Sequence, residues 1–206
     1  MSHNTSRLPR SHTLSVKGGF TIVELMVTIG IFVVITGLTL ARYRSFNINA
    51  DFSNTIEDVV IALREAQVYG AGGKGNATCG GLSVYDCSYG VHFALGSSYN
   101  IFVDNNGSNS YDGGDTVRES KSLAGGATIT SISCATAETN SGIPYNCING
   151  YVDIMFKRPS PDAFISETPV PTFSDDKALV TIKNADSSKT ATITITCAGQ
   201  MALQVQ

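Results

Sequence analysis

The sequence predicts an α+β protein, in which a long N-terminal helix packs on an antiparallel β-sheet domain. The first observation is a 22-residue stretch, residues 20–41, with 15 apolar residues and one formal charge. Apolar residues then recur at three- and four-residue steps across residues 51–69, which is the spacing of a helix that buries one face. Beyond this segment, β-branched and alternating runs are separated by Gly, Pro, Asn or Asp, a pattern typical of short strands. A helix followed by a series of strands is characteristic of the α+β class.

Composition and charge divide the chain into a basic start and an acidic body. The 206 residues are 42% apolar and 15% charged, with a mean hydropathy of +0.07, and this length favours one globular domain. Residues 1–19 hold Arg7, Arg10 and Lys17 and no acidic residue, whereas the rest of the chain holds 11 basic and 17 acidic residues. An acidic body disfavours nucleic acid as a partner, because phosphates are bound by basic surfaces.

The apolar stretch 20–41 is long enough to cross a membrane. At about 1.5 Å per residue it extends about 33 Å, against a hydrocarbon core of about 30 Å. A buried helix of a soluble core is disfavoured because no polar face interrupts the stretch. A secretory signal peptide is disfavoured because its apolar region is only about 7–15 residues long. The basic leader indicates a cytoplasmic N-terminus with the C-terminal domain outside, although Arg42 and Arg44 beyond the stretch compete with that bias.

Glu24 is the one formal charge inside the apolar stretch. A carboxylate there costs about 2.5–3.5 kcal/mol on insertion scales, so it calls for a cationic partner. No Lys or Arg lies within one helical turn of it. Cleavage after Gly19 would give Phe20 a free amine, and that amine on a neighbouring subunit would suit Glu24. Such a contact is heterologous and open-ended, which is how filaments grow.

The segment Lys17-Gly18-Gly19-Phe20-Thr21-Ile22-Val23-Glu24-Leu25 resembles the class III signal of type IV pilins and type II secretion pseudopilins. The resemblance implies cleavage between Gly19 and Phe20 by a prepilin peptidase, N-methylation of Phe20, and Glu24 as the assembly carboxylate. It implies as partners other pilin or pseudopilin subunits, the lipid bilayer and the assembly platform. Ala41 stands where many pilins carry a helix-kinking proline, so no kink is expected there.

Looser motifs extend the resemblance to the GspH/FimT group of minor pilins. They are Phe52 through Arg64-Glu65-Ala66, Tyr99–Asp104, Asp115–Arg118 and Ile154–Pro159. The resemblance implies a structural minor subunit of a type II secretion pseudopilus or a type IV pilus, located in the cytoplasmic membrane and then in the filament. A DNA-uptake minor pilin is disfavoured because no charged residue follows Lys189. A membrane-tethered adhesin is the alternative from another class.

These boundaries divide the chain into four parts: a leader over 1–19, an apolar helix over 20–50, an amphipathic helix over 51–71 and a β-rich domain over 72–206. Whether Asn47 and Asn49 interrupt one long helix is left open by the sequence. Glycines at 70, 72 and 73 are expected to end the second helical segment. The predicted strands are Tyr89–Ala94, Tyr99–Asp104, Thr116–Lys121, Ala127–Ser133, Tyr151–Phe156, Leu179–Lys183 and Ala191–Cys197.

A twelve-residue polar loop carries oxygen side chains in the register of a calcium-binding EF-hand loop. Asp104, Asn106, Ser108, Asp112 and Asp115 fall at positions 1, 3, 5, 9 and 12, and calcium takes six to eight oxygen ligands. Asn109 replaces the usual glycine at position 6, but Asn tolerates the left-handed conformation. The alternative is a hairpin loop whose Asp and Asn side chains accept local backbone hydrogen bonds.

All five cysteines lie beyond the apolar stretch. In an extracytoplasmic domain they can oxidise, and the short separations favour the pairs Cys79–Cys87 and Cys134–Cys147, with Cys197 left over. Zinc is disfavoured because no C-x-x-C spacing occurs.

The sequence carries no signature of an enzyme. It lacks G-x-S-x-G, Walker and H-E-x-x-H motifs, and no G-x-G-x-x-G run follows a predicted strand and opens a helix, as the Rossmann fingerprint requires. His92 is the one histidine beyond the leader. We therefore expect a structural protein without catalytic residues.

Overall fold

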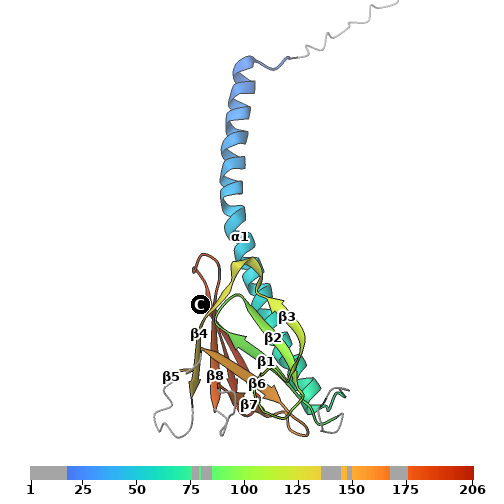
Figure 1. The fold of residues 1–206 in the computed structure, drawn as a ribbon. Helices are drawn as coiled ribbons and strands as arrows, with labels where there is room; N and C mark the ends of the chain where they lie inside the picture. Colours follow the sequence, from blue (N-terminus) through green and yellow to red (C-terminus); the bar gives the residue numbers. More distant parts are fainter. Residues whose placement is uncertain (1–17, 76–78, 80–84, 136–144, 148–149, 168–175) are drawn as a thin grey trace, which may run out of the picture. The chain divides into compact units, whose positions relative to one another are not determined.

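In the computed structural model, the described residues are 18–75, 79, 85–135, 145–147, 150–167 and 176–206. Most of the predicted leader, residues 1–17, lies outside them. The chain forms two compact units, Met1–Tyr43 and Arg44–Gln206. The predicted α+β class is confirmed, because an apolar N-terminal helix precedes antiparallel β-sheets (Figure 1).

One helix, α1, extends over Ile22–Ala71. Neither Ala41 nor the asparagines at 47 and 49 interrupt it, which answers the question that the sequence left open. The helix ends within the group of glycines that was expected to end it. The amide of Gly72 donates a hydrogen bond to the carbonyl of Val68 at 2.9 Å, and Gly73 adopts a φ of +63°. A glycine in the left-handed region is the common way to end a helix.

The predicted apolar stripe on the second half of α1 is buried. Five members of the stripe belong to the same hydrophobic core as residues of the strands. They are Phe52, Ile56, Val59, Leu63 and Ala66. Ala62 is buried with them, whereas Val60 is only partly buried. Gly70 lies so close to strand β6 (Tyr151–Phe156) that a Cβ atom would meet the main-chain oxygen of Phe156. The second half of α1 therefore packs on the sheet domain through a continuous apolar face.

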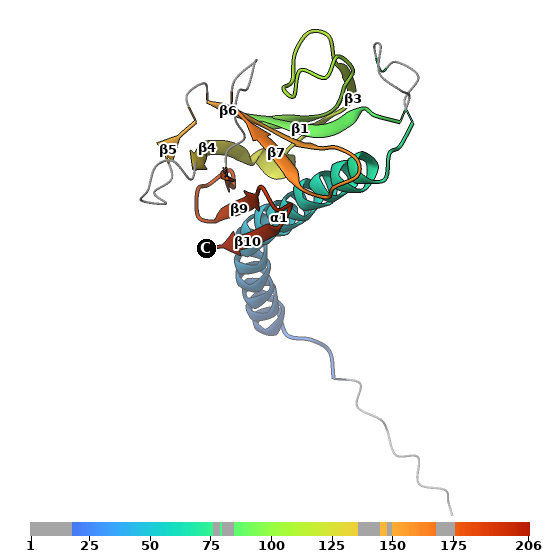
Figure 2. The ribbon, with the colours of Figure 1, turned by 90° about the horizontal axis from the view of Figure 1, so that it is seen from below.

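The strands form two antiparallel five-stranded sheets. The first has the order β3-β2-β1-β6-β7 and the second the order β10-β9-β8-β4-β5. The first sheet comprises β1 (Ser88–Ala94), β2 (Ser98–Asp104), β3 (Thr116–Ser122), β6 (Tyr151–Phe156) and β7 (Ala163–Ser166). The second comprises β4 (Thr128–Ala135), β5 (Tyr145–Asn146), β8 (Lys177–Lys183), β9 (Thr190–Thr196) and β10 (Met201–Val205). A 3₁₀ turn, η1 (Ala124–Gly126), precedes β4, and both sheets contribute to the core beside α1 (Figure 2).

All seven predicted strands are present, each with ends within two residues of the prediction. Three further strands, β5, β7 and β10, were not predicted, and the division into two sheets was not foreseen. β5 and β7 have two and four residues, too few for a readable alternation. β10 lies at an edge and is largely exposed, so its sequence does not alternate between apolar and polar residues.

Candidate functional site

The segment with the cleavage motif leads directly into α1. Gly18 to Thr21 are not helical, and the helix begins at Ile22. The hydroxyl oxygen of Thr21 accepts a hydrogen bond from the amide of Glu24 at 3.2 Å, so Thr21 caps the helix. Glu24 is thus the third helical residue, where a carboxylate is stabilised by the positive end of the helix dipole. This local role was not predicted, although the pattern Thr-x-x-Glu over Thr21–Glu24 is its signal in the sequence.

Glu24 is exposed and forms no ion pair within the described part of the chain. Phe20, four residues before Glu24, is 80% exposed. The cationic partner that the sequence predicted therefore does not come from the described residues of the same chain. An amine from a neighbouring subunit stays a prediction.

The first half of α1 carries apolar side chains that none of the described residues cover. Residues Ile22–Leu40 form a stretch that is long and apolar enough to cross a membrane, and none of it is buried. Its threonines donate their hydroxyl hydrogens to carbonyls of the same helix: Thr28 to Leu25 at 2.9 Å and Thr36 to Phe32 at 2.7 Å. Such internal pairing is what a polar group needs in lipid.

Two glycines in this half, Gly30 and Gly37, face open space. Beyond the neighbouring backbone of the helix itself, a Cβ atom at either position would meet no atom of the described residues within 4 Å. Glycine costs about 1 kcal/mol relative to alanine in a helix interior. The packing within the described part of the chain therefore does not explain why glycine stands at these positions.

Both predicted disulfides, Cys79–Cys87 and Cys134–Cys147, are present. Cys197, which the predicted pairing left without a disulfide partner, is free and exposed. Among the residues that the structure describes, one group of three metal-ligand side chains converges: Cys134, Cys147 and Glu167. Because both of these cysteines are oxidised, the group offers no thiolate to a metal.

The carboxylates of the predicted calcium loop bind the loop's own backbone. Asp104 is buried and accepts hydrogen bonds from the amides of Gly107 at 2.7 Å, Ser108 at 3.2 Å and Asn109 at 3.1 Å. Asn109 has a φ of +58°, the left-handed conformation expected at that position. Asp115 accepts hydrogen bonds in the same way.

The other acidic groups of the loop differ in their electrostatic surroundings. Hydrogen bonds from the Asn106 side chain and the Gly114 amide lower the pKa of Asp112. The side-chain oxygen of Asn106 in turn accepts a hydrogen bond from the Ser108 amide. Burial raises the pKa of Asp115 to about 6. Asp104, Asp112 and Asp115 do not converge as a three-ligand group. The arrangement matches the hairpin alternative, and calcium binding stays a prediction that isothermal titration of the full chain with calcium checks.

His92 joins the same loop to the first sheet. Its Nδ1 atom lies 2.6 Å from Oδ1 of the fully buried Asp153, whose other oxygen accepts a hydrogen bond from the amide of Tyr111 at 2.9 Å. The ring of Tyr111 lies against the His92 imidazole with 4.5 Å between centroids. His92 and Asp153 thus anchor the loop to the sheet. Their separation of 61 residues explains why the sequence did not reveal the pair.

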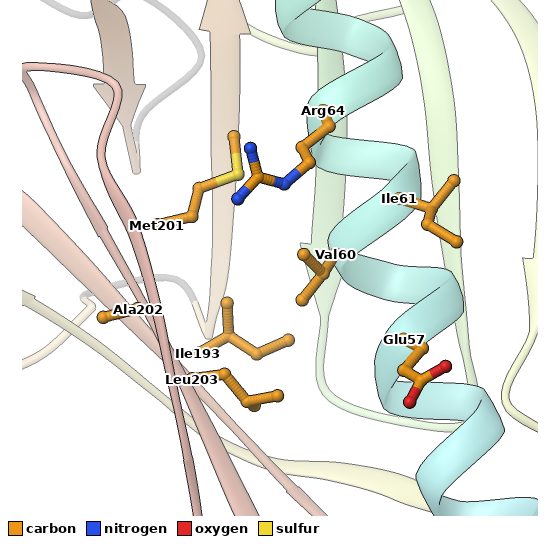
Figure 3. A pocket seen from close by; sticks show the side chains of 8 residues that line it. All are labelled: Glu57, Val60, Ile61, Arg64, Ile193, Met201, Ala202 and Leu203. Atoms are coloured by element: carbon orange, nitrogen blue, oxygen red, sulfur yellow. The ribbon is translucent and has the colours of Figure 1, made fainter.

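An apolar groove of about 350 Å³ runs between α1 and β10 (Figure 3). Its aliphatic walls come from α1, β10 and, through Ile193, β9, and Glu57 and Arg64 of α1 lie among them. Figure 3 shows the Arg64 guanidinium extending toward Met201. The lining residues are Glu57, Val60, Ile61, Arg64, Ile193, Met201, Ala202 and Leu203. The groove can accommodate an aliphatic side chain.

Comparison with known proteins found no matching family model, no matching curated protein and no matching solved structure.

Proposed function

We propose that this protein is a structural pilin or pseudopilin subunit, inserted in the cytoplasmic membrane and then incorporated into a type II secretion pseudopilus or a type IV pilus. One observation carries the proposal. The exposed apolar helix Ile22–Leu40 directly follows a Gly19-Phe20 junction that resembles a prepilin cleavage site, with Glu24 in its first turn.

The exposed helix requires two successive environments. Large apolar side chains, among them Met26, Phe32 and Leu38, are at least 64% exposed, and water is an unfavourable solvent for such a surface. A bilayer covers the surface before assembly, with the N-terminus in the cytoplasm and the sheet domain outside. Helices of neighbouring subunits cover it after assembly. The two disulfides suit an extracytoplasmic domain, because they persist in oxidising compartments.

Glu24 has two roles in this proposal. In the single chain it lies at the positive end of α1, where Thr21 caps the helix. In the filament its carboxylate pairs with the amine that cleavage creates on Phe20 of an adjacent subunit. An unpaired carboxylate in an apolar environment is costly. Subunits whose axial register brings Glu24 to the amine of Phe20 are therefore favoured over subunits in other registers.

The two uncovered glycines support helix packing between subunits. Small residues let helix backbones approach closely in an apolar environment, where packing replaces the hydrophobic effect as the driving force. Gly30 and Gly37 have open space in front of them. A neighbouring helix there would account for glycine at both positions.

Mass spectrometry of the mature chain tests the proposed processing. We expect the N-terminus to be Phe20 carrying one N-methyl group, and Gly19→Val to leave the leader attached. An uncleaved chain that functions at the cell surface would support the membrane-tethered adhesin instead and overturn the proposal.

Three matched variants separate the two roles of Glu24. Glu24→Ala is expected to leave membrane insertion and cleavage intact and to abolish most incorporation into filaments. Glu24→Gln keeps a side chain suited to the helix start but removes the charge, so it should fail to the same degree. Thr21→Ala removes the cap but keeps the carboxylate and should incorporate nearly normally. Sheared-filament immunoblots measure incorporation, and normal incorporation of Glu24→Gln would refute the ion pair.

A further inference from the structure

A polar cleft of about 240 Å³ lies between the second half of α1 and the β3 edge of the first sheet. Its polar side chains come from three elements: Thr55 and Asp58 from α1, Tyr99 from β2, and Glu119 and Lys121 from β3. Figure 1 shows β3 beside this part of the helix. The strand register explains the grouping. Tyr99 pairs directly with Lys121, and Glu119, two residues before Lys121, lies on the same face of the sheet.

Tyr99 brings a buried hydroxyl group into this cleft. The residue is 3% exposed, and its hydroxyl oxygen has no hydrogen-bond partner within the part of the chain that the structure describes. The ring is held against Phe93, with 5.6 Å between the centroids. Buried hydroxyls are normally hydrogen-bonded, since leaving one unpaired costs free energy. The side chain therefore offers a fixed hydrogen-bonding group for a molecule that enters the cleft.

The surroundings keep this hydroxyl in its neutral form. Burial raises the pKa of Tyr99, and the carboxylates of Asp58 and Glu119 raise it further. A neutral phenol retains lone pairs that can accept a hydrogen bond. Both carboxylates influence the hydroxyl, but neither is its hydrogen-bond partner. The hydroxyl and the two carboxylates are therefore electrostatically coupled without a direct hydrogen bond between them.

The charges of the cleft select the sign of that group. Lys121 Nζ lies 3.6 Å from Glu119 Oε2 and balances that carboxylate. Asp58 forms no ion pair within the described residues, so the cleft retains one negative charge. An anionic ligand would be repelled by it. A divalent cation would need about six oxygen ligands and would lie near the Lys121 ammonium, which makes it a poor fit.

The cleft is small in comparison with typical ligand pockets. Its volume of about 240 Å³ lies below the range of about 300–1,000 Å³ that is usual for drug-sized ligands. One terminal group of a side chain, or a small amine, matches this size. N–H donors are required, because the carboxylate and the hydroxyl lone pairs are acceptors.

We propose that this cleft binds a single ammonium or guanidinium group, with Asp58 as its ion-pair partner and the Tyr99 hydroxyl as a hydrogen-bond acceptor. The proposal stands independently of the filament function. The cationic group comes either from a basic side chain of a second copy of this chain or from a free small amine.

Nuclear magnetic resonance of the full chain in detergent micelles, labelled with ¹³C-tyrosine, tests the proposal. The Tyr99 signal is assigned by its loss in Tyr99→Phe. The probes are methylguanidinium and n-butylammonium, with tetramethylammonium as a cation that lacks N–H donors. We expect a saturable shift of the Tyr99 signal with the first two probes and none with the third.

Asp58→Asn should weaken binding of both probes about tenfold or more, because it removes the ion pair. Glu57→Gln is the matched control. It makes the same charge change at the neighbouring position of α1, on the side that lines the apolar groove, and should leave the affinity unchanged. If no saturable shift occurs at millimolar probe, or if Asp58→Asn binds like the wild type, the cleft holds water only and the proposal is wrong.

Tyr99→Phe separates binding from folding. Isothermal titration should show weaker probe binding by about threefold or more, since one hydrogen bond is lost. The thermal midpoint should not fall, because the hydroxyl has no partner among the described residues. A lower midpoint with unchanged probe affinity would assign the hydroxyl a structural role and overturn its role in binding.

Analytical ultracentrifugation of the full chain in micelles distinguishes the two sources of the cation. If a second copy supplies it, Asp58→Asn and added methylguanidinium both reduce self-association. If a free amine supplies it, self-association is unaffected although probe affinity still falls in Asp58→Asn.

Discussion

Helix α1 exposes the large apolar side chains of its first half and buries those of its second half, although one continuous helix carries both sets. Leu38 is 64% exposed and Leu63 is fully buried. The second half concentrates its apolar residues on one stripe that meets the sheets. The first half distributes them around its circumference, so no single face could bury them. The second half of α1 therefore packs against its own chain, whereas the described residues leave the apolar surface of the first half uncovered.

The largest expected effect comes from truncating a leucine in each half. Leu63→Ala should destabilise the sheet domain by about 2–5 kcal/mol, because it removes buried methyl groups and leaves a cavity. Leu38→Ala should change the same quantity by less than about 0.5 kcal/mol, as is usual for exposed positions. Denaturant unfolding of the full chain in micelles measures both. A comparable loss at Leu38 would mean that the two halves are not energetically separate.

Adding a methyl group should act differently in the two halves. Gly70→Ala places a Cβ atom against the main-chain oxygen of Phe156 and should cost about 1–3 kcal/mol through overpacking. Gly37→Ala meets no atom of the described chain, so the unfolding midpoint of the sheet domain should stay unchanged while helicity rises slightly. Circular dichroism of the purified chain measures both quantities.

The same Gly37→Ala variant also has an expected effect on filament assembly in cells. If a neighbouring helix packs on Gly37 in the filament, the added methyl group should reduce incorporation without affecting insertion. Unchanged incorporation would place Gly37 away from the helix contacts.

The smallest expected effect concerns a threonine in each half. The hydroxyl oxygen of Thr55 accepts a hydrogen bond from the Ala124 amide at 3.2 Å, so Thr55→Val should cost about 1 kcal/mol. Thr36 pairs with the carbonyl of Phe32 within its own helix, and Thr36→Val should be close to neutral. Thermal unfolding followed by circular dichroism checks the pair. An equal cost at Thr36 would show that its hydroxyl has a partner outside α1.

Features that depend on neighbours in the sequence were predictable. The strand over Tyr151–Phe156 was predicted with its exact ends, because a run of apolar and β-branched residues shows itself within a few positions. The disulfide pairs followed from separations of 8 and 13 residues. The spacing of oxygen side chains in the 104–115 loop left open both calcium binding and local backbone hydrogen bonds, and only the structure shows that Asp104 accepts hydrogen bonds from its own loop.

Contacts between distant residues were not predictable from one sequence. Asp153 on β6 contacts His92 on the neighbouring strand β1. Tyr99 on β2 lines a cleft together with residues of α1 and β3. Both depend on which strands become neighbours. That choice results from the whole core and leaves no local pattern.

Local order along the chain follows from the sequence: a basic leader, an apolar helix with Glu24 in its first turn, an amphipathic helix and a series of strands. The physical reason is that periodicity, capping and turn formation act over a few residues. The separation of the strands into two sheets, the exposed edge at β10 and the cleft around Tyr99 arise only when the chain packs. These features depend on burial and hydrogen bonding among residues far apart in the sequence, and a single sequence does not contain the pairing that decides them.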